Sequence, residues 1–365
     1  MALVGVATLI PRIFFGILSG TIADRHGRLR LMFFANVMRA VMMVTLAVSL
    51  AIYEFQLYLV LAAAFVLGLG QSMFLPSVNA FLPTAVAAED LGTANGLISA
   101  IQQFISIVGS PLGGLFIGLI GMVATIIFNS VAYVVSALFI LSVPLLAGSM
   151  KAESSAPNPN SKRRSFLEEI REGFAYLKTE AGLLKVTLSD FGANFFLVLF
   201  TTYIVIYSDV LLKQGSVVYG ILVGSLGAGF GVGSLLVGHL RSERRFGVWY
   251  SVTWGIASLL ILGLVLFPAV MPAVGFLLVI GVLGGIGNTT FITGAQKFVP
   301  NALQGRYFGF EDAGSLAASP AGQVAGGLLI ASAGLQAAYT IAAVGAAIFS
   351  FGVLLFADVR SLRVD

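Results

Sequence analysis

Long apolar stretches separated by short polar turns recur along the whole of this 365-residue chain. Each stretch is about 20 residues or longer, which is the length that a helix needs to cross the hydrocarbon core of a bilayer. Eleven such stretches are predicted, at 2–23, 31–52, 57–82, 91–119, 122–146, 186–212, 217–240, 246–270, 273–298, 307–333 and 335–356. The pattern predicts an all-α membrane protein with many spans.

The chain contains two copies of one sequence pattern. Segment 79–83 recurs at 296–300, and each copy ends in a proline. The glycine pairs at 113–114 and 326–327 correspond in the same way, as do 16–20 and 234–238, so the copies lie roughly 215 residues apart. Internal repeats of this kind predict a duplicated helical bundle with two pseudo-symmetric halves.

The second copy has one more predicted helix than the first, because residue 1 corresponds to about residue 219 and stretch 186–212 comes before that point. We therefore expect five helices in an N-terminal bundle, 1–146, and six in a C-terminal bundle, 186–365, which ends in a short tail. The offset also leads us to expect that the start is artificial or mis-assigned, with about 30–45 upstream codons encoding a further span.

Basic residues lie almost entirely on one side of the predicted membrane. With Met1 outside, only Lys213 falls on the outer side, while Arg12 and Arg39 lie within stretches. The others share the inner side: Arg25, Arg28, Arg30, Lys151, Lys162, Arg163, Arg164, Arg171, Lys178, Lys185, Arg241, Arg244, Arg245, Lys297, Arg306, Arg360 and Arg363. Because cytoplasmic loops carry the excess of positive charge, we expect the N-terminus outside and the C-terminus in the cytoplasm. The pI near 9.4 then reports topology, and no nucleic-acid partner is expected.

The segment 147–185 is predicted to link the two bundles. It begins with the polar run 154–160, whose composition cannot bury enough apolar surface to become ordered. Ser165 and Glu168 then form a capping-box pattern, and apolar residues repeat at helical spacing from Phe166 to Leu177. We expect a flexible linker followed by an amphipathic helix that lies on the membrane surface.

Composition narrows the function classes. Hydrophobic residues make up 58% of the chain and charged residues 10%, and the mean hydropathy is +0.99, far from soluble domains. The chain has no cysteine, and neither His26 nor His239 has metal-ligand spacing, so no metal site or disulfide is expected. No Walker loop, His-Glu-x-x-His or Gly-x-Ser-x-Gly motif is present, so no cofactor, enzyme activity or ATP-driven pumping is expected.

The turn after the first stretch carries a distinctive pattern, with Gly20, then Asp24 and Arg25, then Gly27 and Arg28. It resembles the signature loop of the major facilitator superfamily. Small residues let two helices approach, a glycine permits a tight reversal, and arginines hold the turn at the cytoplasmic face. The alternative is that the arginines act only as topology determinants.

The resemblance implies a role for the aspartate of this loop. In that superfamily the aspartate faces the N-terminus of a helix in the opposite half, which here starts near Arg306. A carboxylate is favoured there by the helix dipole. Asp24 is therefore predicted to act as a latch between the two halves.

The fourth stretch resembles the motif of the antiporter branch through Gly96, Gly109, Gly113 and Gly114. Two positions differ from that motif. The motif has glycine where this chain has Ile105, and proline where it has Ser110, so that Pro111 comes one place late. The resemblance favours export, and the alternative is that the glycines only form a small-residue packing face.

Three further segments, 74–83, 91–96 and 300–306, resemble the branch of the superfamily that contains macrolide-efflux and enterobactin-exporter proteins. This resemblance covers nearly the whole chain. It implies a fold of twelve helices, of which this sequence begins at the second. The absent helix normally lines the cavity in that branch, and its polar or acidic groups would be missing here.

Ionisable residues within spans are costly, so each calls for a reason. Arg12 lies too deep to reach the inner surface easily, and is predicted to pair with a carboxylate or an anionic ligand. Glu311, Asp312 and Asp190 are candidate proton carriers, because burial favours the protonated form of a carboxyl group. The alternatives are a structural ion pair for Arg12 and stabilisation of helix N-termini for the acids.

Arg39, nine residues into its stretch, is interpreted as snorkelling to the membrane surface. Asn79 and Gln296 occupy matched positions in the two copies, and we expect them to contact the ligand in a central cavity. Interhelical hydrogen bonding is the alternative for both residues.

These observations favour a secondary transporter, with export of a small amphiphilic compound such as a drug or siderophore in exchange for protons. The expected partners are that compound, protons and the lipid bilayer of a prokaryotic cytoplasmic membrane, and we expect a monomer. The alternatives are an importer or lipid mover of the same fold and a truncated remnant that does not transport.

Overall fold

The computed structural model describes residues 4, 7–12, 14–15, 22, 27–53, 56–146, 176–214, 216–240 and 242–363. These residues form helices joined by short turns, with no strand among them. The N-terminal part of the chain provides α2 (Arg28–Ile52), α3 (Leu57–Ala85), α4 (Leu91–Ile120) and α5 (Met122–Leu146). The C-terminal part provides α7 (Ala181–Thr202), α8 (Ile204–Ile206), the π-helical turn η1 (Tyr207–Leu211), α9 (Ser216–Leu240), η2 (Ser242–Arg245), α10 (Phe246–Leu266), α11 (Val270–Phe298), α12 (Gln304–Ala333), α13 (Leu335–Gly352), η3 (Val353–Leu355) and α14 (Ala357–Arg360).

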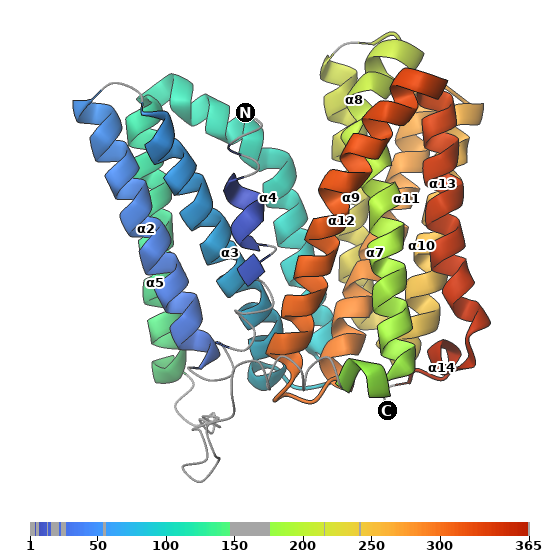
Figure 1. Ribbon diagram of the computed structural model, residues 1–365, viewed down its shortest axis with the longest axis horizontal. Helices are drawn as coiled ribbons and strands as arrows, with labels where there is room; N and C mark the ends of the chain where they lie inside the picture. Colours follow the sequence, from blue (N-terminus) through green and yellow to red (C-terminus); the bar gives the residue numbers. More distant parts are fainter. Residues whose placement is uncertain are drawn as a thin grey trace. The chain divides into compact units, whose positions relative to one another are not determined.

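Ten of the eleven predicted spans coincide with long helices of the structure, which confirms the all-α membrane fold (Figure 1). Within the described ranges, nine helical segments are long and apolar enough to cross a bilayer, and α4 adds a further helix of 30 residues. The first predicted span is described at a few positions, where 7–12 are helical. The predicted amphipathic helix lies almost entirely outside the described residues.

The chain divides into two compact units that do not follow chain order. Unit 1 comprises Met1–Ala85, Ser110–Tyr176 and Val299–Leu316, and unit 2 comprises Val86–Gly109, Leu177–Phe298 and Ala317–Asp365. Each unit thus takes in a short piece from the other half of the chain. The boundaries fall inside α4 and inside α12, so both helices belong to both units.

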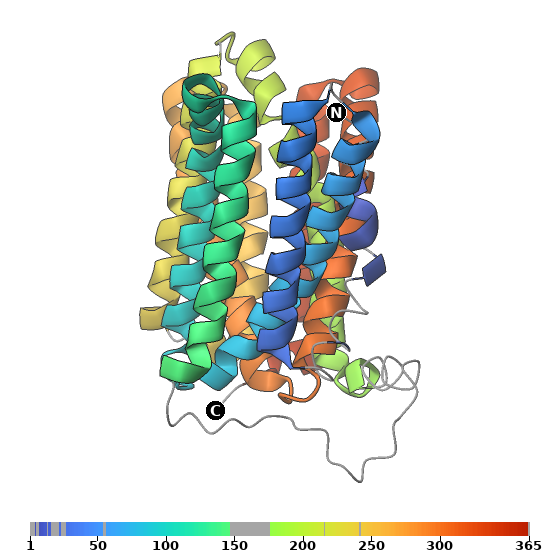
Figure 2. The ribbon, with the colours of Figure 1, turned by 90° about the vertical axis from the view of Figure 1, so that its left-hand side faces the viewer.

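In unit 1, α2 packs against α3 and α5, and Figure 2 shows α2 and α5 side by side. Met43, Leu46 and Ala63 form a small apolar cluster between these helices. Two polar contacts tie α2 to α5: Asn36 donates a hydrogen bond to the Ser136 hydroxyl (2.8 Å), and Ser130 donates one to a backbone carbonyl of α2.

In unit 2, α9 and α11 make the most extensive helix contact, and glycines allow it. A methyl group added at Gly285 would strike the backbone oxygen of Phe230, and one at Gly233 would strike that of Val282. Small residues of this kind let helices approach closely in membranes. Tyr207 and Tyr339 stack within the adjoining apolar core, to which α7, α10 and α13 also contribute.

Candidate functional site

The signature turn is described from Gly27 onward. Gly27 has a φ of 90°, the left-handed conformation that a tight reversal requires and that glycine adopts without steric cost. The guanidinium of Arg28 donates hydrogen bonds to the backbone oxygens of Ala80 in α3 and Asn301, just before α12. Arg28 is therefore more than a topology determinant, because it ties three segments of unit 1 together.

The other residues of the turn, Gly20, Asp24 and Arg25, lie outside the described residues, so the latch stays a prediction.

Arg12 and Asp312 form an ion pair inside unit 1, with 3.6 Å between Nη2 and Oδ1. The two side chains are 22% and 12% exposed. Arg12 Nε and Asp312 Oδ2 are buried atoms without a hydrogen-bond partner. Arg12 thus faces a carboxylate, an arrangement that fits both the predicted functional pairing and the alternative of a structural ion pair. The pair retains unused hydrogen-bonding capacity.

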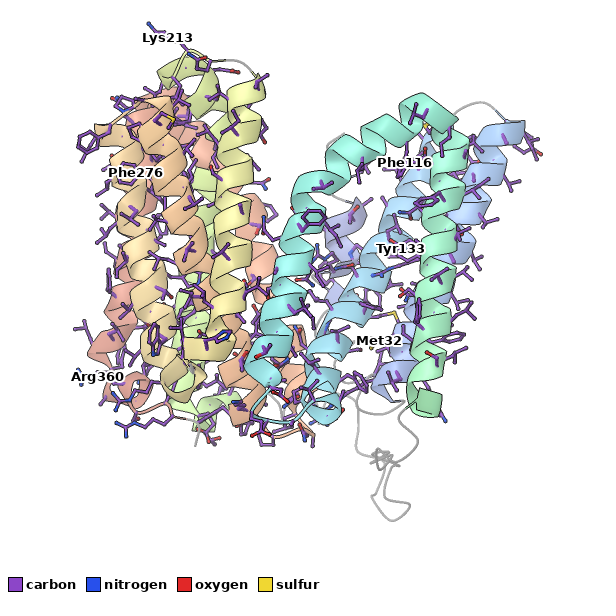
Figure 3. The ribbon with its side chains drawn as sticks, turned by 180° about the vertical axis from the view of Figure 1, so that it is seen from behind. Met32, Phe116, Tyr133, Lys213, Phe276 and Arg360 are labelled. Carbon is purple, nitrogen blue, oxygen red and sulfur yellow. The ribbon has the colours of Figure 1, made fainter. Side chains whose placement is uncertain are left out.

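Arg39 is enclosed by the helices of unit 1. Its side chain is 4% exposed, so the snorkelling interpretation is wrong. The guanidinium lies over the rings of Phe74 (5.6 Å) and Tyr133 (5.5 Å), and Nη2 donates a hydrogen bond to Gln71 Oε1 (3.2 Å). Figure 3 labels Tyr133 on α5. The side chain lies directly on Gly70 of α3, where a larger residue would displace it.

The two other candidate acids have hydroxyl partners. Glu311 accepts a hydrogen bond from Ser315, one turn later on α12 (3.3 Å). Asp190 accepts one from the phenol of Tyr250 across the contact between α7 and α10 (2.7 Å). Among the described residues, Arg12 forms its ion pair with Asp312 and not with Glu311 or Asp190.

Asn79 and Gln296, the two neutral residues expected to contact the ligand, have different surroundings in the structure. Gln296 is buried and accepts a hydrogen bond from Asn95 (2.5 Å), which also donates to Thr293 (2.9 Å). For Gln296 the structure thus shows the interhelical alternative. Asn79 is half-buried on α3. Sequence reasoning missed Asn95, although an amide in the first turns of an apolar helix was a usable signal.

The glycines of the antiporter-like motif have different surroundings. Gly96 lies against the backbone of α9 at Ser234, so this part of α4 packs closely in unit 2. At Gly113 a methyl group would meet no described atom within 4 Å, and at Gly109 it would meet only Ile105 of the same helix. Pro111 and Gly114 continue that helix. Of the three motif glycines whose surroundings are described, Gly96 is the one that forms a tight packing face.

No group of three or more potential metal ligands occurs among the residues that the structure describes.

The comparisons place this architecture. The family model of the Major Facilitator Superfamily matches residues 1–310. The chain belongs to this superfamily. Its members are transporters and not enzymes, so this chain is a multi-pass membrane transporter that acts on small molecules.

Several relatives share modest identity. An uncharacterized transporter of the superfamily from Bacillus subtilis is 26% identical over 351 residues, 93% of this chain and 80% of that protein. The multidrug efflux pump Tap of Mycobacterium tuberculosis is 27% identical with the same coverages. Macrolide efflux protein A of Enterococcus faecalis is 26% identical over 188 residues, 52% of this chain and 55% of that protein.

Among solved structures, the human organic anion transporter MFSD10 matches 96% of this chain and 83% of its own, with a TM-score of 0.74 and 14% identity. This likeness supports the fold alone.

Proposed function

We propose that the chain is a secondary transporter that exports a small amphiphilic compound in exchange for protons, with Asp312 as the proton carrier. The observation that carries this proposal is the ion pair with Arg12. It joins a nearly buried carboxylate to a guanidinium, and one carboxylate oxygen has no hydrogen-bond partner. That oxygen is a place where a proton can bind.

The physical basis is the cost of a buried charge. Burial penalises the ionised carboxylate, and Arg12 compensates for that penalty while the two groups face one another. When the pair separates, the carboxylate loses its compensation and takes up a proton. A conformational change that opens and closes the pair therefore moves protons.

Export is supported by two observations. The relatives include proteins named for efflux, and the run from Gly96 to Gly114 resembles the antiporter motif in part. The chain would act by alternating access between bundles 1–146 and 186–365, as a monomer without a nucleic-acid partner. The one-sided basic residues support a cytoplasmic-membrane location with the C-terminus inside.

Inverted vesicles that contain the full chain test the proposal, with uncharged chloramphenicol and cationic ethidium as probes. An acidic lumen is expected to drive uptake of at least one probe several-fold above that in vesicles without the chain. Asp312→Asn should abolish the response to the gradient, whereas Glu311→Gln and Asp190→Asn should retain it. Uptake that ignores the gradient, or an unchanged Asp312→Asn response, would contradict proton coupling at this residue.

A further inference from the structure

One side of α4 carries a line of polar side chains that continues into the middle of the span. Its members follow one another at intervals of four, three and four residues, so they lie on one face of the helix. They are Asn95, Ser99, Gln102 and Ser106, here called the α4 polar stripe. The helix contains no charged residue. The stripe is therefore a set of uncharged hydrogen-bonding groups.

The α4 polar stripe has a buried end and an exposed end. Asn95 and Ser99 are 4% and 6% exposed, and Asn95 donates its hydrogen bonds to α11. Gln102 and Ser106 are exposed. At 1.5 Å per residue, Ser106 lies about 20 Å from either end of α4. The exposed end of the stripe thus lies deep within the span.

The opposite side of α4 has the character of a lipid-facing surface. Phe104 comes two residues after Gln102, which turns it about 200° around the helix axis, and it is 66% exposed. Leu97 and Ile101 on that side are 53% and 48% exposed. Exposed apolar side chains suit hydrocarbon, whereas an amide there loses its hydrogen bonds to water. Because polar groups inside spans face protein or water-filled space, exposed Gln102 and Ser106 indicate water on their side of the helix.

The second copy of the repeat contains an equivalent of α4. Both α4 and α12 have 30 residues, and their first and last residues are offset by the same 213 positions (304 − 91 and 333 − 120). The glycine pairs at 113–114 and 326–327 have this offset as well. It matches Gln102 with Ser315, Ser106 with Ser319, and Ser99 with Asp312. The polar stripe is thus repeated, position for position, on the helix whose carboxylate pairs with Arg12.

We propose that Gln102 and Ser106 bind the uncharged, oxygen-bearing part of the transported amphiphile. This inference rests on the proposed function, because it names the substrate class that the exposed end of the stripe recognises. One helical turn separates the two residues, so one compound can contact both. The amide supplies two donors and an acceptor, and the hydroxyl donates and accepts. Hydroxyl, amide and ester groups match this set, whereas an ionic group would find no counter-charge on α4.

Helix packing is the competing account. If another transmembrane segment covers the exposed end of the stripe, Gln102 and Ser106 only join helices, as Asn95 does at the buried end. Water would then be excluded from both positions. The two accounts differ in the access of water, which single cysteines can report because the chain has no cysteine of its own.

The first experiment labels single cysteines in the full chain with a charged methanethiosulfonate in permeabilised membranes. The variants are Gln102→Cys, Ser106→Cys and the lipid-side control Phe104→Cys. A thiol reacts as its thiolate, which forms in water and not in hydrocarbon. We expect the two stripe positions to react at least tenfold faster than the control. Labelling as slow as that of Phe104→Cys at both positions would overturn the proposal.

Two steroid probes then identify the group that is recognised. Methyl cholate carries hydroxyl groups, and methyl 5β-cholanate is the same ester without them. Methyl cholate is expected to slow the labelling of Ser106→Cys several-fold, while the cholanate ester has little effect. The exposed control Gln214→Cys should be labelled at the same rate with either ester. Equal protection by both esters, or none by methyl cholate, would overturn the assigned substrate class.

Equilibrium binding of methyl cholate to the purified full chain tests the glutamine itself. Gln102→Leu should weaken binding several-fold, because the amide is lost at nearly constant volume, and Gln102→Asn should restore part of it. Phe104→Leu is the matched control and should bind as the wild type does. Unchanged binding by Gln102→Leu would contradict a direct contact.

Neither labelling nor binding uses a proton gradient. Fast labelling and selective protection without gradient-driven uptake would keep the binding site and remove the proposed coupling. Gradient-driven uptake that depends on Asp312, together with slow labelling of both stripe positions, would keep the coupling and remove the site.

Discussion

Unit 1 places Arg12, Arg39 and Asp312 between its helices, whereas the closest helix contact of unit 2 is made by glycines and contains no charge. In unit 2 the polar contacts between helices include the neutral amide of Asn95 with Gln296. Charges in a span cost free energy, while glycine contacts gain dispersion energy without desolvating a charge. We propose that unit 1 retains these costly groups for transport and that close glycine packing stabilises unit 2, where the carboxylate of Asp190 is met by the hydroxyl of Tyr250.

The largest effect is expected where the glycine contact is broken. Gly285→Leu would place a side chain against the backbone of Phe230, which cannot move aside without separating α9 from α11. Overpacking typically costs about 1–3 kcal/mol, and a collision with backbone lies at the upper end. We expect most of the folded protein to be lost, as measured by the monodisperse yield in detergent and by thermal unfolding.

Gly275→Leu is the matched control, because it lies on the same helix with no described atom within 4 Å of the added carbon. It should leave yield and thermal midpoint unchanged. If both leucine variants fold equally well, close glycine packing does not stabilise unit 2 and the comparison loses its basis.

The helical spans and the charged contacts inside them differ in how far the sequence predicts them. Spans follow from runs of about 20 apolar residues, so ten helices were predicted almost to their ends. The partner of Arg12 could not be identified, because Asp312 lies far away in the chain and the sequence offered three candidate acids. A pair of this kind depends on the rotation of each helix about its axis.

Helix rotation also explains the error at Arg39. The helix that carries it is apolar on most sides, so the sequence pattern does not show which side faces protein and which faces lipid. An arginine in such a helix is assigned to the membrane surface by default. Gly70, which makes room for the side chain on α3, was the missed signal.

A smaller effect, of the opposite sign, is expected when the unmatched charge of unit 1 is removed. Arg39→Met keeps much of the side-chain volume and relieves the cost of the buried charge, which insertion scales place at about 2.5–3.5 kcal/mol. The loss of two cation–π contacts offsets part of that gain, at about 0.5–2 kcal/mol each. The thermal midpoint should therefore stay unchanged or rise.

Thermal unfolding of Arg39→Met in the same detergent provides the test, with Arg30→Met as the exposed control on α2. A fall in the midpoint comparable to that of Gly285→Leu would mean that Arg39 is a structural residue. The division between a stabilising unit and a costly one would then be wrong.

The smallest effect concerns an ion pair of unit 2 that joins Lys185, in the first turns of α7, to Asp358, which lies outside the spans. Lys185 donates a hydrogen bond to Asp358 of α14, and its ammonium group also lies 4.5 Å from the Phe356 ring centre. The hydrogen bond from Lys185 lowers the pKa of Asp358 below its ordinary value. A lowered carboxyl pKa stabilises the fold above the unfolded-state pKa, about 3.9, and this stabilisation is lost as the pH falls through the folded-state pKa.

Wild type should therefore unfold at a slightly higher temperature than Asp358→Asn near pH 6, and the difference should vanish at pH values below the folded-state pKa. High salt should shrink the difference at pH 6, because both side chains are partly exposed. A difference that grows on acidification would reverse the sign required by this ion pair, and one as large as that of Gly285→Leu would show that charge, rather than glycine packing, stabilises unit 2.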